Sequence, residues 1–238
     1  MSHPQPAVLF LRVPAVAPDR EAAYEKWYDE VHIPYRMDKP DFLGAERYDV
    51  LVGRQRYFVF YELSSVSALT SAPYLALREW EAAQPADTFE AVGRSRPVGL
   101  ERGVYEQVSG PQWPSVAIEA PFAYVAGHEP AGDDELALGA WYDDVHTPNV
   151  ARIPGVLAIR RFVLTRAQMG AQSGLRTDRP RCIAVYYLAS ESVASDPAFL
   201  REQETARGRE GTAAAAPYVL LGRLVRALRA RPVASSAT

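Results

Sequence analysis

The chain has 238 residues, of which 48% are hydrophobic and 23% are charged, and its formal net charge is -3. This length accommodates one large domain or two domains of about 100 residues, and the small negative charge provides no electrostatic basis for binding nucleic acid. The one cysteine, Cys182, excludes an intrachain disulfide and a cysteine-based zinc site, which fits a reducing cytoplasm. The N-terminal residues lack a signal-peptide pattern, and no apolar run approaches the roughly 20 residues of a membrane span. We therefore expect a cytoplasmic protein with no membrane partner.

A nine-residue motif occurs twice in the chain. KWYDEVHIP (Lys26–Pro34) returns 114 positions later as AWYDDVHTP (Ala140–Pro148), and both copies keep a histidine although the chain has four in all. The alignment continues downstream and resumes at a shift of 125 positions after an extra segment in the second copy, residues 166–179. Such self-similarity indicates two copies of one unit rather than a solenoid, which needs at least three. We predict a first unit at residues 1–110 and a second at residues 115–230, with a linker at 109–115.

Both copies predict the same elements in the same order. An apolar strand (residues 7–13 and 122–127) precedes the motif helix, which we expect to begin at the N-cap residues Asp19 and Asp133 and to end near Pro34 and Pro148. Two strands then form an antiparallel hairpin, a second helix follows, and a last strand closes each unit near residues 98–108 and 218–228. The order βαββαβ is the ferredoxin-like arrangement.

This order predicts an α+β fold. The helices of a ferredoxin-like unit cover one face of its antiparallel sheet and leave the other face bare. Two units in one chain can cover these bare faces by packing against each other. We therefore expect two tandem βαββαβ units whose antiparallel sheets pack face to face as an α/β barrel.

The motif resembles a known family. WYDDVHTPNVARIPGVLAIRRF in the second copy, with Trp-Tyr-x-x-x-His-x-Pro followed by Pro-Gly and an Arg-aromatic pair, is similar to the EthD-like branch of the dimeric α/β-barrel superfamily. The first copy departs from the pattern at Asp41, where the pattern has Gly. The resemblance implies the ferredoxin-like fold in both units, and a chain that is a monomeric pseudo-dimer or a homodimer. It also implies a range of roles on aromatic or polyketide-like compounds: isomerases, cyclases, dehydratases, cofactor-free monooxygenases and haem enzymes.

The two motif histidines are the best candidates for catalysis. On a helical wheel, Trp27, Tyr28 and Val31 lie on the buried face and His32 lies at its margin. The second copy repeats this arrangement, with Trp141, Tyr142 and Val145 inward and His146 at the margin. An imidazole can take or give a proton near neutral pH. We therefore predict His32 and His146 as general acid–base residues, and we expect the acidic residues Asp29, Glu30, Asp143 and Asp144 to point mainly into solvent.

Aromatic and arginine side chains around these histidines are candidates for binding the substrate. Tyrosine hydroxyls can hold a substrate oxygen, and arginine can hold a carboxylate, enolate or phenolate. The predicted set lies on the motif helix and on the strands that face it: Tyr28, Tyr142, Trp27, Trp141, Arg47, Arg161, Tyr61 and Tyr186.

These residues also have a structural interpretation. A histidine in a last helical turn can interact with the unpaired carbonyls there, Trp and Tyr at this spacing commonly form a core, and an arginine can pair across a sheet. We expect His128, in the loop before the second motif helix, to lie on the surface, and Cys182 to be buried and unreactive. Residues 166–179 form either a mobile loop or a lid over the second pocket.

The sequence thus predicts a cofactor-independent enzyme that acts on a small aromatic or polyketide-like molecule, in biosynthesis or aromatic catabolism. Histidine acid–base chemistry would isomerise, cyclise or dehydrate this substrate, which makes the protein an isomerase, cyclase or lyase without a metal. Two alternatives stay open: a haem-dependent or cofactor-free oxidoreductase or monooxygenase of the same superfamily, and a non-catalytic small-molecule-binding or scaffold protein. The HExxH, phosphate-loop and GxSxG motifs do not occur.

Overall fold

A computed structural model describes residues 5–86, 88, 92, 99–112, 120–130, 134–165, 180–208 and 218–229. The part before residue 113 is called the first half and the part after residue 119 the second half. The first half contains β1 (Ala7–Val13), α1 (Pro18–Trp27), η1 (Tyr28–His32), α2 (Ile33–Met37), β2 (Phe42–Val52), β3 (Tyr57–Leu63), η2 (Val66–Thr70), α3 (Ala72–Ala83) and β4 (Glu101–Ser109). The second half contains β5 (Phe122–His128), α4 (Asp134–Trp141), η4 (Tyr142–His146), α5 (Thr147–Val150), β6 (Val156–Leu164), β7 (Cys182–Leu188), η5 (Glu191–Ser195), α6 (Pro197–Gly208) and β8 (Tyr218–Arg229).

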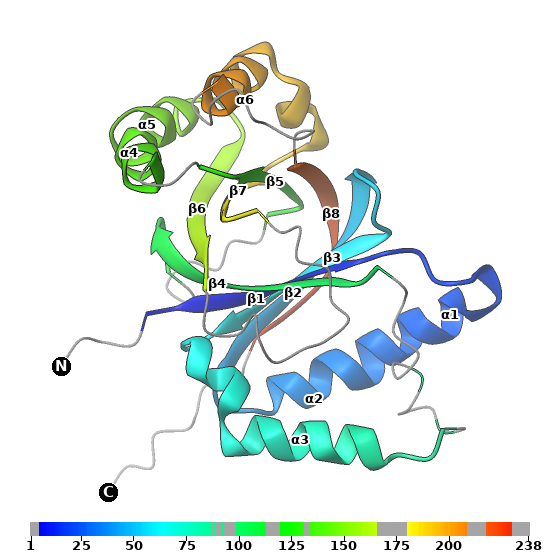
Figure 1. Cartoon of the computed structure of the whole chain (residues 1–238). Coiled ribbons are helices and arrows are strands. Elements are labelled where there is room, and N and C mark those ends of the chain that lie inside the picture. Colours follow the sequence, from blue (N-terminus) through cyan, green and yellow to red (C-terminus); the bar gives the residue numbers. More distant parts are fainter. Residues whose placement is uncertain are drawn as a thin grey trace, which may run out of the picture.

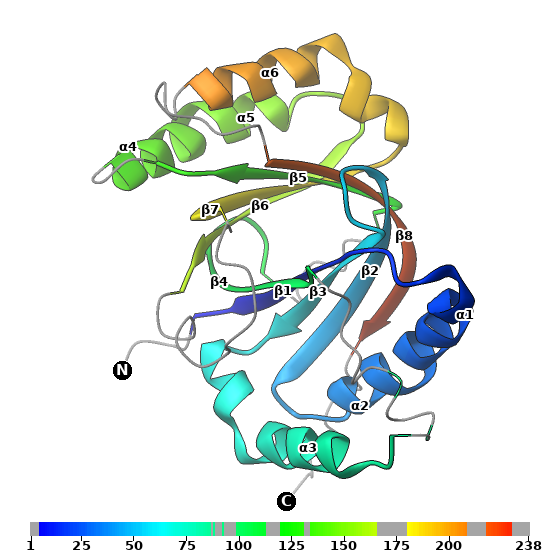
Figure 2. The same cartoon turned by 45° about the vertical axis from the view of Figure 1, so that its right-hand side comes forward.

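The strands form a closed antiparallel barrel in the order β1-β3-β2-β8-β5-β7-β6-β4. β4 pairs with β1 of its own half and with β6 of the other half, and β8 likewise pairs with β5 and β2. Helices α1–α3 cover one side of the barrel and α4–α6 the opposite side (Figures 1 and 2). This arrangement confirms the predicted fold of helix-covered antiparallel sheets packed face to face. The unit boundaries at 110 and 115 stay an interpretation of the repeat.

Side chains alternate along each strand between two environments, as period-2 geometry requires. In β3, Tyr57, Val59 and Tyr61 pack under the helices of the first half, whereas Phe58 and Phe60 point into the barrel. β7 repeats this division, and its helix-facing residues join a third core beneath α4–α6. The molecule therefore has one apolar core inside the barrel and one between each sheet and its helices.

A charged cluster lies inside this apolar barrel. Arg160 on β6 donates hydrogen bonds to both carboxylate oxygens of Glu62 on β3, at 2.5 and 2.8 Å, and a further one to Gln107 at 2.8 Å. Glu46 on β2 is 1% exposed and accepts a hydrogen bond from Tyr48 at 3.3 Å. Burial and the neighbouring charge of Glu62 raise the pKa of Glu46 to about 8, against the opposing effect of Arg160. This cluster ties the first half to the second across the barrel.

The motif helix differs from the prediction at both ends. It begins at Pro18 with Ala17 as N-cap, so Asp19 lies in the first turn rather than at the cap, and Asp133 lies outside the described residues. The helix continues past Pro34 and Pro148, because a single π-turn precedes each proline. In this turn the amide of Ile33 donates to the carbonyl of Tyr28, five residues back, and Thr147 repeats the bond to Tyr142.

The π-turns have a physical reason. Proline cannot donate a backbone hydrogen bond, and its ring clashes with the carbonyl four residues earlier in an α-helix. A wider turn relieves this clash and lets the chain continue as α2 and α5. Single π-turns of this kind occur frequently at functional sites. The wider turn also extends the helix far enough to bring a further residue, Arg36, beside His32.

Two further predictions concern residues outside the described ranges. The proposed lid, residues 166–179, is one of these, and residues 113–115 of the predicted linker are the other. Among the helices that the structure describes, none has the length and apolar character needed to cross a membrane.

Candidate functional site

The first half contains a pocket between its helices and its sheet, here called the His32 pocket. Its interior has about 70 Å³ of space, and about 540 Å³ when its open mouth is included. Aromatic and aliphatic side chains of β1, α1 and η1 form its base, and polar groups stand around them. The polar and aromatic lining residues used below are Trp27, Tyr28, His32, Arg36, Tyr74, Arg78 and Arg102.

His32 is positioned by its neighbours on three sides. Its ring lies against Trp27 and Tyr28, with centroids 4.5 and 4.6 Å away. Its Nδ1 atom lies 3.9 Å from a carboxylate oxygen of Glu81 on α3. Arg36 in turn holds Glu81 through two hydrogen bonds of 2.8 and 3.2 Å. At this distance Glu81 makes no hydrogen bond to Nδ1, but its carboxylate lies close enough to stabilise a protonated imidazole.

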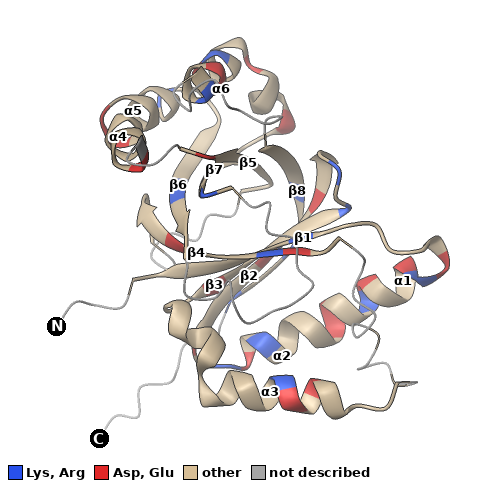
Figure 3. Cartoon of the chain, viewed as in Figure 1, with Lys and Arg blue, Asp and Glu red and all other residues tan. Residues whose placement is uncertain are grey.

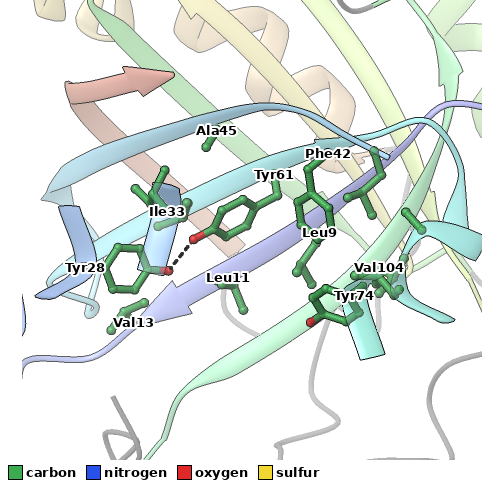
Figure 4. Close-up of a cluster of buried hydrophobic side chains, with 14 of the residues drawn as sticks. Leu9, Leu11, Val13, Tyr28, Ile33, Phe42, Ala45, Tyr61, Tyr74 and Val104 are labelled. Atoms are coloured by element: carbon green, nitrogen blue, oxygen red, sulfur yellow. Dashed lines mark hydrogen bonds between the residues drawn. The ribbon is translucent and has the colours of Figure 1, made fainter. Parts of the chain in front are cut away.

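Two tyrosines close the inner end of the pocket. Tyr61 on β3 donates a hydrogen bond of 3.4 Å to the hydroxyl of Tyr28, and the two hydroxyls point toward each other between β1 and the motif helix (Figure 4). Burial raises the pKa of both tyrosines, so both hydroxyls stay protonated near neutral pH. Tyr28 lines the pocket, whereas Tyr61 lies behind Tyr28 and does not line it.

The lining of the His32 pocket is basic. Arg36, Arg78 and Arg102 come from α2, α3 and β4, and Glu81 provides one balancing negative charge. Basic and acidic positions on α2 and α3 lie near one another (Figure 3). Burial raises the pKa of Tyr74, but the charges of Arg36, Arg102 and Arg78 outweigh it and lower this pKa below its usual value. A pocket that stabilises a phenolate in this way also favours other small oxyanions.

The second half contains a different pocket, here called the His128 pocket. It has about 40 Å³ of interior space, or about 340 Å³ with its mouth. His128, Glu135, Tyr142, Arg161 and Cys182 supply its polar groups, and the remaining walls are apolar. His128 is 2% exposed at the end of β5, and its Nε2 lies 2.5 Å from the Tyr142 hydroxyl. The predicted surface position of His128 is therefore wrong, because the strand extends one residue further than the sequence suggested.

His146, the second motif histidine, is completely buried and does not line the described pockets. Its Nε2 is 2.7 Å from the Tyr186 hydroxyl, and its Nδ1 is 3.3 Å from a carboxylate oxygen of Glu202. Burial, His128 and Arg161 lower its pKa to about 4. It is therefore neutral near pH 7.

Substitutions between the halves explain why the two pockets are not equivalent. Leu9 pairs with Tyr61 on the neighbouring strand, and Tyr124 pairs with Tyr186 in the same way. The ring of Tyr124 packs edge to face on Phe199, with centroids 5.1 Å apart. Phe199 stands where the first half has Tyr74, so the larger Tyr124 in place of Leu9 is the change that fills the space in the second half.

The reverse exchange opens the His128 pocket. Val13 pairs with Tyr57 in the first half, whereas His128 pairs with Cys182 in the second. Leu138 likewise stands where the first half has Tyr24. The rings of Tyr24 and Tyr57 lie 6.5 Å apart and fill this space in the first half. Each half therefore has a pocket of its own, at a different place.

The two predicted strand arginines make ion pairs with the motif helix. Arg47 lies 3.4 Å from Asp29 and does not line the His32 pocket. Arg161 hydrogen-bonds to Asp143 at 3.1 Å and also borders the His128 pocket. The expectation that Asp29 and Asp143 mainly face solvent is therefore incomplete, because each neutralises an arginine. Glu30 and Asp144 are exposed as predicted.

The prediction of which motif-helix residues are buried is correct except at Val145. Trp27, Tyr28, Trp141 and Tyr142 are buried as expected, and so is Val31. Val145 is 43% exposed although the wheel placed it inward, so the surroundings rather than the helical period decide this position. Trp141 packs against the ring of His146, with centroids 5.0 Å apart.

Sequence reasoning missed several pocket residues. Arg36 follows His32 by one turn, but the expected helix end at Pro34 concealed it. Arg78 lies four residues after Tyr74, a spacing that places both on one helix face. Arg102 had no local signal. Cys182 is half-buried at the His128 pocket, and burial raises its pKa to about 12, which agrees with the expected low reactivity.

The surroundings of the histidines bear on whether these pockets could hold haem or a metal ion. An axial histidine directs a ring nitrogen to iron beside a cavity that holds the macrocycle. The Nε2 atoms of His128 and His146 instead contact tyrosine hydroxyls, and His32 lies against two aromatic rings beside Glu81. These contacts differ from those of an axial iron ligand. Within the described ranges, no three His, Cys, Asp or Glu side chains gather as a metal site.

Comparison with known proteins identifies similar structures. The chain is similar to an anthrone oxidase-like protein (TM-score 0.61, 13% identity, covering 98% of this chain and 97% of that one). It is also similar to a protein from Fusobacterium nucleatum that carries the name of a monooxygenase (TM-score 0.58, 11% identity, 96% of each chain). A third is a variant of chlorite dismutase from Candidatus Nitrospira defluvii (TM-score 0.54, 13% identity, 94% of this chain and 93% of that one). No protein-family model and no curated protein matches the sequence. At these identities the similarity establishes the ferredoxin-like α/β-barrel fold.

Proposed function

We propose that the His32 pocket is the active site of a cofactor-independent enzyme that transfers a proton on a small aromatic or polyketide-like ketone. The observation that carries this proposal is the position of His32, which borders the pocket with Glu81 near its Nδ1 atom and arginines in the pocket lining. His146, at the matching motif position, is completely buried and lines neither pocket.

The residues have distinct roles in this reaction. His32 takes a proton from a carbon next to the substrate carbonyl, so that a C–H bond breaks, an N–H bond forms and an enolate remains. Glu81 stabilises the imidazolium, and Arg78 and Arg102 stabilise the enolate oxygen. Return of the proton to another carbon isomerises the substrate, and its delivery to a leaving hydroxyl releases water.

The pocket also limits the substrate. Its interior admits one ring-sized group, and the remainder of a larger molecule would lie at the open mouth. The arginines of the lining favour a ligand that is anionic or becomes anionic during the reaction. The protein would belong to the EthD-like branch, and its two sheets in one chain would make it a pseudo-dimer without need of a second copy.

Hydrogen–deuterium exchange of 2-tetralone, an enolisable aryl ketone, tests the proposal. Proton NMR in D₂O follows loss of the signal from the carbon next to the carbonyl. We expect the wild-type protein to accelerate this exchange, and His32→Gln to reduce the acceleration about 10²- to 10⁴-fold. Glu30→Gln changes an exposed residue on the same turn and should leave the rate unchanged. Exchange that equals the buffer rate with the wild-type protein, or that survives His32→Gln, would refute the assignment.

A cofactor-free monooxygenase is the second candidate. Its first step is the same deprotonation, after which the electron-rich carbon reacts with dioxygen. Two of the similar structures carry oxidase or monooxygenase names. An oxygen electrode separates the candidates, because anthrone consumption with uptake of dioxygen that depends on His32 favours the monooxygenase, and exchange without uptake favours the isomerase.

A further inference from the structure

Tyr74 on α3 is a tyrosine of the His32 pocket that stands apart from the motif helix. Its side chain is buried and lines the pocket together with His32. Its ring packs on Phe42 of β2, with centroids 5.4 Å apart, which fixes it between α3 and the sheet. In Figure 4 the Leu11 side chain lies between Tyr74 and Tyr28, and all three line the pocket. Tyr74 therefore faces the same space as His32 from a different element.

Arginines on three elements act on Tyr74. Burial raises the pKa of Tyr74, but the charges of Arg36 on α2, Arg102 on β4 and Arg78 on α3 outweigh it and lower this pKa below its ordinary value of 10.0. Tyr61 on β3 also interacts with Tyr74, but burial raises its own pKa and keeps it neutral near pH 7. Tyr74 is therefore a stronger acid than an ordinary tyrosine.

Glu81 holds two of these arginines. Arg36 donates hydrogen bonds of 2.8 and 3.2 Å to the Glu81 carboxylate, and the Nε atom of Arg78 lies 3.6 Å from it. One carboxylate thus faces two guanidinium groups, so positive charge remains beside Tyr74. This charge stabilises the tyrosinate that forms when Tyr74 gives up its proton.

The second half keeps the motif histidine but replaces the charged groups and Tyr74. Along the repeat and the strand pairing, Arg36 matches Val150, Tyr74 matches Phe199, Arg78 matches Gln203, Glu81 matches Ala206, and Arg102 matches Val219. His146, which remains, lines neither pocket. Since Phe199 and its neighbours support the same helix without these groups, Tyr74 and the arginines serve the His32 pocket rather than the fold.

We propose that Tyr74 is a further catalytic residue, which recognises the carbonyl oxygen of the substrate and donates a proton to it while His32 takes the proton from carbon. This inference rests on the proposed function of the His32 pocket. The C–H bond breaks as an N–H bond forms on His32, and the Tyr74 O–H bond breaks as an O–H bond forms on the substrate. A neutral enol results, with an imidazolium near Glu81 and a tyrosinate beside the arginines. The enol returns its O–H proton to Tyr74 as His32 protonates a carbon.

The other tyrosine hydroxyl of the pocket is a poorer donor. Burial raises the pKa of Tyr28, and its hydroxyl accepts a hydrogen bond from Tyr61. A general acid works best when its pKa lies near the operating pH. Donation from Tyr74 also moves the negative charge from the substrate to a group that the arginines already compensate. The site therefore fits a neutral ring ketone whose oxygen reaches Tyr74 while its apolar body lies on Leu9 and Leu11.

2-Naphthol tests the contact without turnover, because it is a stable analogue of the enol of 2-tetralone. Tyr74→Phe removes the hydroxyl, and Phe199 occupies the matching position of the second half, so the fold accommodates this side chain. By calorimetric titration, we expect the variant to bind 2-naphthol about tenfold more weakly, which is the loss of about one hydrogen bond. Naphthalene lacks the hydroxyl and should bind the variant and the wild type equally. Tyr35→Phe changes a tyrosine outside the pocket lining and should leave both affinities unchanged.

Exchange of 2-tetralone in D₂O tests the proton donation. Tyr74→Phe should lower kcat for exchange above the buffer rate by about 10²-fold. In the wild type, kcat should fall at alkaline pH as Tyr74 loses its proton, with a midpoint below 10.0 because the arginines lower its pKa. This alkaline fall should be absent from Tyr74→Phe, a result that a purely structural role of Tyr74 would not produce.

Three outcomes would overturn the proposal. Equal affinity of Tyr74→Phe and the wild type for 2-naphthol contradicts the contact with the oxygen. An alkaline fall that persists in Tyr74→Phe contradicts the proton donation, and so does exchange that depends on His32 but not on Tyr74. Wild-type protein that binds 2-naphthol through Tyr74 and does not exchange 2-tetralone would refute the proposed function and support Tyr74 as the residue that recognises the oxygen, so the two proposals can fail separately.

Discussion

The buried carboxyl of Glu46 makes the stability of the barrel depend on pH. Its folded-state pKa is about 8, against an ordinary value of 4.5. The native state therefore retains a proton that the unfolded chain releases above pH 4.5. Stability that this group contributes at low pH is lost as the pH rises toward 8, because the unfolded state then binds fewer protons than the native state.

The size of this effect follows from the difference between the two pKa values. Each pH unit between them costs about 1.4 kcal/mol, so the wild type loses about 2.5 kcal/mol between pH 5 and pH 7 through Glu46. Glu46→Gln cannot ionise and does not lose this contribution. The free energy of unfolding of this variant relative to the wild type should therefore increase by about 2.5 kcal/mol over the same range.

Urea denaturation at pH 5, 6 and 7 measures this difference, because titrations elsewhere in the protein cancel between the two proteins. Glu30→Gln is the matched control. Its side chain is 59% exposed, and the difference from the wild type should stay within about 0.5 kcal/mol at each pH. A constant difference for Glu46→Gln, or one that shrinks as pH rises, would mean that native Glu46 is ionised beside Arg160 and would refute the reasoning.

Three other predictions follow from buried groups and backbone geometry. Arg160→Met leaves Glu62 buried without its cation, and it should lower the free energy of unfolding by about 3–5 kcal/mol in urea titrations at pH 7. The double variant Arg160→Met with Glu62→Leu should recover most of this lost free energy. Gly110→Ala places a β-carbon against the backbone of Ile159 at a φ of 93° and should cost about 1–3 kcal/mol, measured by thermal unfolding. His146 should titrate near pH 4 in histidine NMR and destabilise the fold as pH falls from 6.5 toward 4, because its folded-state pKa is lowered; a midpoint near 6.5 would contradict its burial.

The sequence alone determined the architecture. Apolar periodicity and turn residues are local properties, and they occur twice in the same order, so the βαββαβ pattern and the need to cover two bare sheet faces follow from the chain itself. The motif residues that face the sheet, such as Trp27 and Tyr28, were predictable for the same reason. The helix end at Pro34 was predicted wrongly, because a π-turn allows a proline where an α-helix does not.

The tertiary structure decided which residues form pockets. Arg36, Arg78 and Arg102 reach the lining of the His32 pocket from two helices and a strand. Their convergence depends on strand register and helix packing rather than on local period. Side-chain volume on neighbouring elements also contributed: Leu9 leaves space near His32, whereas the larger Tyr124 fills the matching space near His146. Two nearly identical motifs therefore place one histidine at a pocket and bury the other, because access is set by residues distant in sequence.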